Sequence, residues 1–233
     1  LTDASTGKAL TAGTDYTITY SNNTNPGTAS ITVTALGRNY TGSKVISFKI
    51  TSAAVSGLRV SKIKNNSMRL SWRDQDYADG YQICNANNRV IGTTTNNSYT
   101  VKKLTSCTTY RYKVRSYVEN EDGSVSYGSF STAVSAQTML NTPTLKARSV
   151  SRGKVTLTWT KVAKASGYEI YYSTEKNGIY TKLKTVSKSS ARKYVDAGLA
   201  SGEKYFYTIR AYRTVNGVKT YSSYNTIKSA TVK

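Results

Sequence analysis

The chain has 233 residues and a formal net charge of +21, with 33 lysine and arginine residues against 12 aspartate and glutamate residues. Histidine is absent and cysteine occurs only twice, so the commonest general base is missing and a zinc site has almost no ligands to draw on. We therefore predict a protein with no catalytic activity, no metal site and no cofactor, and the lack of a long apolar run predicts no membrane insertion.

The first 51 residues alternate between apolar and polar side chains in a way that predicts β-strands. Three such runs are separated by two clusters of turn residues, and the runs cover 15–20, 28–35 and 43–50. The stretches Gly13–Tyr20 and Gly37–Gly42 make this segment similar to the short Ig-like β repeats of large surface proteins from Gram-positive bacteria. About 50 residues is thin for a free-standing sandwich. We therefore expect either a further strand before Leu1 or support from the next domain.

The rest of the chain contains one sequence pattern twice. In each copy a tryptophan precedes a Gly-Tyr-x-Ile strand by eight residues, and a leucine precedes an alternating strand that begins with tyrosine by six residues. The first copy contains Trp72, Gly80–Ile83, Leu104 and Tyr110–Tyr117, and the second contains Trp159, Gly167–Ile170, Leu199 and Tyr205–Tyr212. The same residues recur at the same spacings in both stretches, which indicates two copies of one domain.

Both copies resemble fibronectin type III domains, over roughly residues 53 to 233. The resemblance implies an all-β fold of tandem antiparallel β-sandwiches, with each tryptophan in a core and Tyr110 and Tyr205 in tyrosine corners. We predict an Ig-like repeat at 1–51 and two fibronectin-like domains at 52–139 and 140–233. The linkers between them are short, which favours an elongated rod.

The positive charge is concentrated in the last predicted domain. Residues 140–233 carry 18 basic and four acidic residues, which gives +14, whereas residues 52–139 carry +5 and residues 1–51 carry +2. Such a field favours polyanionic partners, although charge also keeps a surface soluble. The strand alternation places several aromatic and basic side chains on the outward face of this domain, and they are Tyr171, Lys182, Lys184, Phe206, Arg210 and Tyr212. This set is either a shallow site for an anionic glycan or ordinary cross-strand packing on a solvated sheet.

The two cysteines, Cys84 and Cys107, lie on or beside neighbouring strands of the first predicted fibronectin-like domain. An extracellular location favours a disulfide between them. The matching positions in the second copy, Tyr171 and Gly202, indicate that the fold does without one. The sequence therefore does not decide whether Cys84 and Cys107 form a disulfide.

These features predict a non-catalytic extracellular region of a bacterial surface protein, acting as a spacer, as a platform that presents other modules, or in adhesion. One alternative is an accessory region of a secreted hydrolase that acts on carbohydrate or cell wall, and another is a polyanion-binding module. The expected partners are a cell-wall polymer, an acidic glycan or another surface protein. We expect no nucleic-acid partner, and we expect a monomer.

Overall fold

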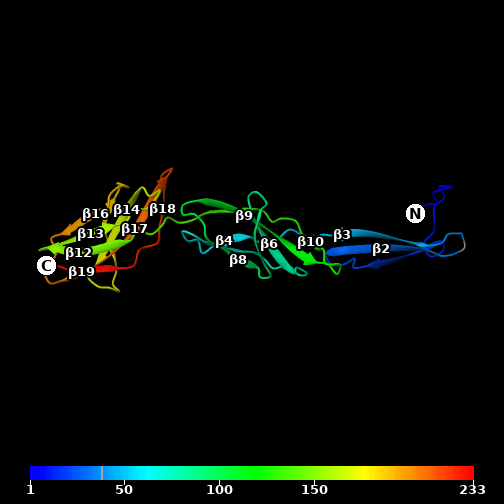
Figure 1. Ribbon diagram of the computed structural model, residues 1–233, viewed down its shortest axis with the longest axis horizontal. Coiled ribbons are helices and arrows are strands. Elements are labelled where there is room, and N and C mark those ends of the chain that lie inside the picture. Colours follow the sequence, from blue (N-terminus) through cyan, green and yellow to red (C-terminus); the bar gives the residue numbers. More distant parts are fainter. Residues whose placement is uncertain (38) are drawn as a thin grey trace. The chain divides into compact units, whose positions relative to one another are not determined.

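The computed structural model describes residues 1–37 and 39–233, so the predicted turn at 36–42 includes one residue, Arg38, that lies outside the described part. The described residues form strands, turns and loops and contain no helix, so no helix that could cross a membrane is found among them. The fold is all-β, as predicted, and contains several antiparallel sheets (Figure 1).

Close packing divides the described residues into two compact units. The first unit contains Leu1–Val60, Leu70–Tyr99 and Arg111–Ser135, and the second contains Ser61–Arg69, Thr100–Tyr110 and Ala136–Lys233. This division runs through the first copy of the repeated pattern. The three domain boundaries expected from the sequence therefore remain a prediction.

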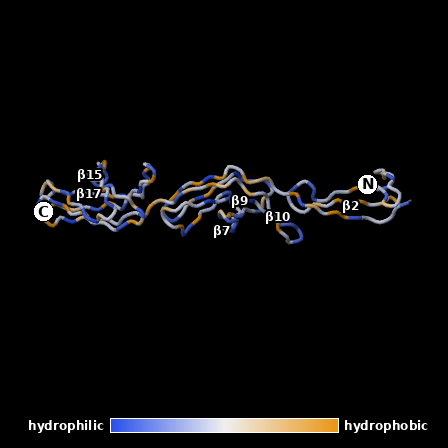
Figure 2. Tube along the Cα trace, turned by 90° about the horizontal axis from the view of Figure 1, so that it is seen from above, coloured by the Kyte–Doolittle hydropathy of each residue, from blue (hydrophilic) through white to orange (hydrophobic). Residues whose placement is uncertain are grey.

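An N-terminal sheet has the order β1-β2-β3, and its strands lie where the alternation predicts them. They are β1 (Tyr16–Ser21), β2 (Gly27–Ala35) and β3 (Ser43–Ile50). The pairs Ile18 with Val33 and Tyr20 with Ile31 place apolar side chains on one face of β1 and β2, and threonines and serines occupy the other face of these two strands. Alternating hydropathy is visible along these strands in Figure 2. Tyr20 stays 59% exposed on the apolar face.

The first copy of the repeated pattern, called the first repeat, is built from two sheets with the orders β4-β5-β8 and β10-β9-β6-β7, and β11 also pairs with β9. Its strands are β4 (Arg59–Ser61), β5 (Met68–Ser71), β6 (Gly80–Asn85), β7 (Val90–Thr94), β8 (Ser98–Val101), β9 (Thr109–Glu119), β10 (Val125–Tyr127) and β11 (Val134–Gln137). Trp72 follows β5 and packs against Tyr81 of β6, with the ring centroids 5.3 Å apart.

The second copy, called the second repeat, has the same topology, with the sheets β12-β13-β16 and β15-β14-β17-β18 and with β19 beside β17. Its strands are β12 (Leu145–Ser151), β13 (Lys154–Trp159), β14 (Gly167–Ser173), β15 (Thr181–Val186), β16 (Lys193–Ala197), β17 (Lys204–Val215), β18 (Val218–Tyr221) and β19 (Lys228–Thr231). Its core joins Leu157 and Trp159 to Tyr168, Ile170 and Ile209 from the facing sheet.

Both predicted tyrosine corners are present. The backbone N–H of Thr105 donates to the hydroxyl of Tyr110 at 2.8 Å, and the N–H of Ala200 donates to the hydroxyl of Tyr205 at 3.4 Å. In each case the tyrosine contacts the chain five residues earlier, at the turn that leads into its strand. The two corners therefore fix the entry of β9 and β17 in the same way.

Candidate binding face of the last domain

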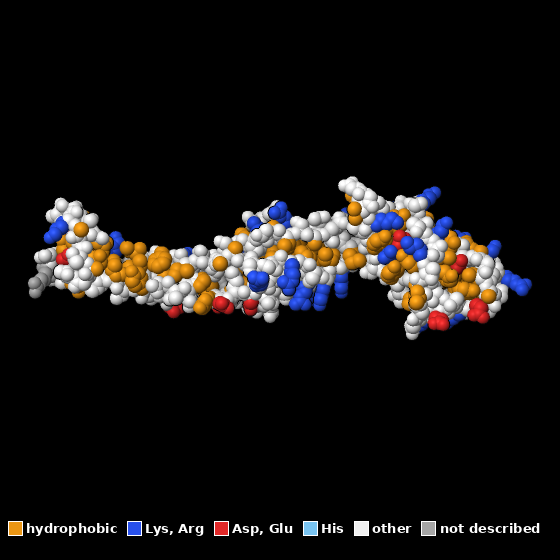
Figure 3. Space-filling view, turned by 180° about the vertical axis from the view of Figure 1, so that it is seen from behind, with side chains coloured by type: hydrophobic (Ala, Val, Ile, Leu, Met, Phe, Trp, Pro, Cys, Tyr) orange, Lys and Arg blue, Asp and Glu red, His pale blue; other side chains and the backbone are white. Residues whose placement is uncertain are grey.

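The outer face of the sheet β15-β14-β17-β18 carries the side chains that the sequence singled out. Along β14, Tyr168 and Ile170 enter the core, so Glu169 and Tyr171 point to the other side. Along β17, Ile209 enters the core and Arg210 lies opposite Glu169 in the strand pairing. Basic and apolar side chains gather at this end of the chain in the space-filling view (Figure 3). The predicted inward and outward assignment of β14 and β17 is therefore confirmed.

Glu169 lies at the centre of this face although it is only 1% exposed. Its Oε2 accepts hydrogen bonds from Nε of Arg210 at 3.0 Å and from Nη2 of Arg210 at 2.7 Å, and the hydroxyl of Tyr171 donates to the same oxygen at 3.0 Å. Its Oε1 has two lysine ammonium groups near it, with Nζ of Lys182 at 3.5 Å and Nζ of Lys219 at 3.6 Å. We call these five residues the Glu169 cluster.

The cluster keeps its carboxylate ionised. Burial by itself would raise the pKa of Glu169, but the hydrogen bonds from Arg210 and Tyr171 and the nearby positive charges outweigh it, and the net pKa is lowered. Burial would lower the pKa of Arg210, and the hydrogen bond to Glu169 reverses this and raises it. At neutral pH the cluster therefore holds one negative and three positive charges.

Tyrosine rings surround the guanidinium of Arg210. Its central carbon lies 3.8 Å from the ring centroid of Tyr221 and 5.0 Å from that of Tyr224. The Tyr171 and Tyr224 rings meet edge to face, with centroids 5.3 Å apart. Nζ of Lys219 lies 4.5 Å from the ring centroid of Tyr212. Cations of the protein itself therefore contact the faces of Tyr212 and Tyr221, which makes these rings poor stacking surfaces for a ligand.

The structure brings together four of the six side chains predicted to form a binding face, namely Tyr171, Lys182, Arg210 and Tyr212. Phe206 lies further along β17, opposite Ser173, and its ring has only Lys204 as a cationic neighbour among the described residues, at 5.7 Å. Lys184 is exposed and lies opposite Ile170, where the pairing of β14 with β15 shifts register.

One expectation about this face was wrong. Tyr212 faces outward as predicted, but it is buried rather than exposed, because Tyr221 pairs beside it on β18 and Lys219 covers its ring. The sequence reasoning also missed Glu169, Lys219, Tyr221 and Tyr224. The alternation along the strand could have pointed to Glu169, because this residue lies on the outward side of a strand whose faces had been predicted. The other three depend on the β17–β18 hairpin and on the segment after it.

Comparisons with known proteins identify both repeats. The model of the fibronectin type III domain matches residues 53–132, and the model of the SORL1-like fibronectin type III domain matches residues 138–229. The chain contains two fibronectin type III domains. We call them the first and second fibronectin domains, and they correspond to the first and second repeats.

Individual proteins resemble parts of the chain. Over 94 residues, or 39% of the chain, it is 36% identical to the amylopullulanase of Thermoanaerobacter thermohydrosulfuricus, and this stretch is 6% of that enzyme. A segment of chicken tenascin with two fibronectin type III domains covers 74% of this chain and 97% of its own length, with 17% identity and a TM-score of 0.42. An Fn3-like protein from Clostridium thermocellum covers 41% of this chain and 96% of its own length, with 27% identity and a TM-score of 0.35.

The first fibronectin domain contains the same arginine arrangement with a neutral partner. Nε and Nη2 of Arg115 donate to Oε1 of Gln82 at 3.0 and 2.9 Å, and the guanidinium carbon lies 3.9 Å from the ring centroid of Tyr127. By strand register, Gln82 corresponds to Glu169, Arg115 to Arg210 and Tyr127 to Tyr221. In each domain an arginine is hydrogen-bonded to a side chain on the neighbouring strand and packs on a tyrosine ring, and we call this arrangement the arginine clamp. The arginine clamp is therefore a structural feature of both fibronectin domains.

The two domains differ in the charge around this arginine. The positions of Lys182 and Lys219 are occupied in the first fibronectin domain by Val90 and Val125, as the pairings of β7 and β10 show. The second domain thus has a carboxylate where the first has an amide, and two lysines where the first has two valines. This difference makes the first domain an internal control for the second.

A glycine in each domain lies against an aromatic ring of the same face. A Cβ added to Gly167 would overlap the backbone oxygen of Val186 and lie 2.6 Å from the hydroxyl of Tyr212, whereas the atoms nearest to a Cβ on Gly80 all belong to the Tyr117 side chain. We expect Gly167→Ala to lower the free energy of unfolding of its domain by about 1–3 kcal/mol, and Gly80→Ala to cost less because a side chain can move. Denaturant titration of each variant measures this, and equal losses would contradict it.

Both cysteines are free in the structure. Cys84 is fully buried on β6, and burial raises the pKa of its thiol. Cys107 is also buried; Nζ of Lys164 donates to its backbone oxygen at 3.1 Å, and Nη1 of Arg213 lies 3.7 Å from its sulfur.

We expect unreduced protein to show two thiols when it is titrated with a thiol reagent in denaturant. In native protein the reaction should be much slower, because both sulfurs are buried and the thiolate of Cys84 is disfavoured. A titre of zero in denaturant would show that the two cysteines are bridged.

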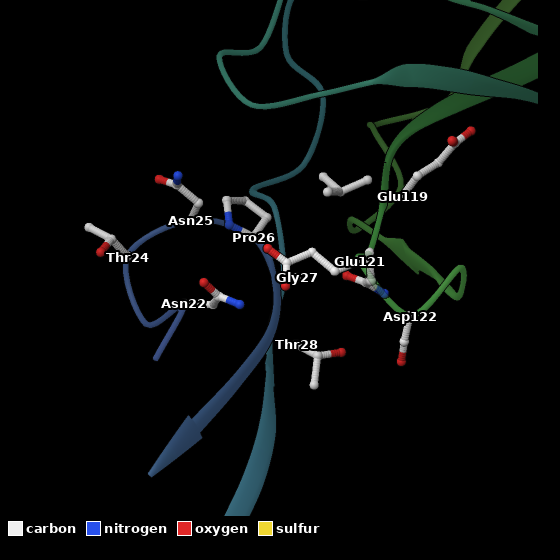
Figure 4. Close-up of a pocket in the computed structure, with 11 residues that line it drawn as sticks. Asn22, Thr24, Asn25, Pro26, Gly27, Thr28, Glu119, Glu121 and Asp122 are labelled. Atoms are coloured by element: carbon white, nitrogen blue, oxygen red, sulfur yellow. The ribbon is translucent and has the colours of Figure 1, made fainter. Parts of the chain in front are cut away.

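A polar pocket of about 490 Å³ lies within the first compact unit, between the turn that precedes β2 and the β9–β10 hairpin. Its lining comes from residues 22–28 and 118–122, and Glu119 points away from it (Figure 4). The hydroxyl and backbone N–H of Ser124 donate to Asp122 and lower the pKa of that carboxyl group. The described residues contain no group of three potential metal ligands, here or elsewhere. We assign no chemistry to this pocket.

Proposed function

We propose that this chain is a non-catalytic extracellular region of a larger protein that acts on polysaccharide, in which the fibronectin domains space or present the other modules. The observation that carries the proposal is the 36% identity to part of an amylopullulanase, a polysaccharide hydrolase by its name, together with two fibronectin type III domains that fill most of the chain. Because the matched stretch is a small part of that enzyme, it supports an accessory role beside a catalytic domain.

The chemistry of the candidate face agrees with an accessory role. The buried carboxylate of this face belongs to Glu169. If Glu169 acted as a general acid, its carboxyl group would need a raised pKa and access to a substrate. Instead, Glu169 is 1% exposed, it is hydrogen-bonded to Arg210 and Tyr171, and its pKa is lowered. The face therefore supports a structural role or a binding role rather than bond cleavage.

The sequence that flanks this region in the full-length protein tests the proposal. We expect a glycoside hydrolase domain in the same polypeptide. Removal of residues 1–233 from that protein should leave kcat on soluble pullulan unchanged and lower the rate on insoluble starch granules. A full-length protein that contains only further surface repeats and a cell-wall anchor would contradict an accessory role, and it would favour a surface spacer or an adhesin.

A further inference from the structure

Two lysines stand beside a carboxylate that is already neutralised and hydrogen-bonded. Arg210 alone balances the charge of Glu169, and Oε2 receives three hydrogen bonds from Arg210 and Tyr171. Lys182 and Lys219 approach only Oε1, at 3.5 and 3.6 Å, and their side chains are 48% and 39% exposed. Each ammonium group has three donors, and neither lysine shares in the three hydrogen bonds to Oε2. The cluster therefore presents excess positive charge to solvent.

The first fibronectin domain indicates that the arginine clamp does not need these lysines. Arg115 binds Gln82 and stacks on Tyr127 with Val90 and Val125 at the two lysine positions. The excess charge is thus specific to the second domain, which also carries most of the net charge of the chain. A local pair of cations within a basic domain is a typical arrangement for anion capture, since the wider field concentrates the ligand and the pair fixes its position.

We propose that Lys182 and Lys219 bind an anionic group of a polysaccharide, either a carboxylate or a phosphate. Because both nitrogens lie within 3.6 Å of one oxygen of Glu169, a single oxyanion on the solvent side can contact both. The rings of Tyr212 and Tyr221 already contact Arg210 and Lys219, so these two rings are not open to stacking, which disfavours nucleic acid bases. The choice of a polysaccharide rests on the proposed function.

The test uses the full chain and four probes. They are polygalacturonate for carboxylate, teichoic acid for phosphate, pullulan as a neutral glycan and duplex DNA as a polyanion of another class. We expect binding to one or both anionic glycans, with affinity falling steeply between about 50 and 200 mM salt, and no binding to pullulan. The variant Lys182→Val/Lys219→Val installs the side chains of the first domain. It should bind roughly tenfold more weakly, the effect of losing two exposed ion pairs.

A control variant separates this site from diffuse charge. Lys184→Val/Lys193→Val removes the same charge from the same domain but from positions outside the Glu169 cluster, and it should change affinity by less than about twofold. Near-ultraviolet circular dichroism checks folding, and Lys182→Gln/Lys219→Gln replaces the valine variant if that variant is unfolded.

Three results would overturn the inference. They are equal losses in the two double variants, no binding to either anionic glycan, and binding to DNA as tight as to the glycans with the same dependence on Lys182 and Lys219. None of these results bears on whether a hydrolase domain accompanies the chain. The proposed function is therefore tested separately, by the sequence that flanks this region.

Discussion

Replacement of Trp159 by alanine should lower the free energy of unfolding of the second fibronectin domain by about 3–5 kcal/mol, the usual loss when a large aromatic side chain is removed from a core. Trp159 is only 5% exposed, and its ring packs against that of Tyr168 with centroids 5.5 Å apart. Few side chains could collapse into the space, because Leu157, Tyr168 and Ile170 are held in paired strands. Differential scanning calorimetry of the full chain measures the loss.

Two controls accompany this prediction. Trp159→Phe keeps an aromatic ring and should cost clearly less, and Trp72→Ala should lower the stability of the first fibronectin domain instead, because Trp72 packs against Tyr81. An unchanged unfolding transition of the second domain in Trp159→Ala would show that this tryptophan is not part of its core.

Replacement of Arg210 by alanine should destabilise the second fibronectin domain by about 3 kcal/mol. Removing one partner of a buried ion pair leaves the other charge buried, which typically costs about 3–5 kcal/mol. Lys182 and Lys219 remain near Glu169 and keep the loss at the lower end. Arg115→Ala leaves the neutral Gln82 behind, so the first domain should lose only about 1–2 kcal/mol.

The chain provides a separate reporter for each domain. Trp72 and Trp159 are its only tryptophans, and each lies in one fibronectin domain. Tryptophan fluorescence of a Trp72→Phe background therefore follows the unfolding of the second domain, and a Trp159→Phe background follows the first. Equal losses for Arg210→Ala and Arg115→Ala would contradict the idea that a buried charge distinguishes the two clamps.

Much of the fold followed from the sequence because period-two alternation reports directly which side of a strand is buried. The spacing from tryptophan to Gly-Tyr and from leucine to tyrosine located both repeats, and the strand faces around Tyr168 and Ile209 were predicted correctly. The strands of the N-terminal sheet were also predicted. These features depend on local order along the chain, which a single sequence contains.

The composition of the candidate face was harder to predict because it depends on which strands lie side by side. Lys219 and Tyr221 reach the face through the β17–β18 hairpin, whose turn at Asn216 and Gly217 has positive φ at both residues. The sequence alone does not give the register that places Tyr221 opposite Tyr212. Glu169 was missed because the predicted face contained only aromatic and basic residues, and the role of Glu169 appears only once Arg210 is placed opposite it.

A double-mutant cycle between Glu169 and Arg210 is the most direct test of the idea that this face is held by an arginine clamp around a buried carboxylate. Glu169→Gln gives the second domain the neutral partner that Arg115 has in the first. In the Trp72→Phe background, we expect Arg210→Ala to cost about 3 kcal/mol beside Glu169 and about 1–2 kcal/mol beside Gln at that position, so the two residues should be coupled by at least about 1 kcal/mol. The same loss with either partner would contradict the clamp.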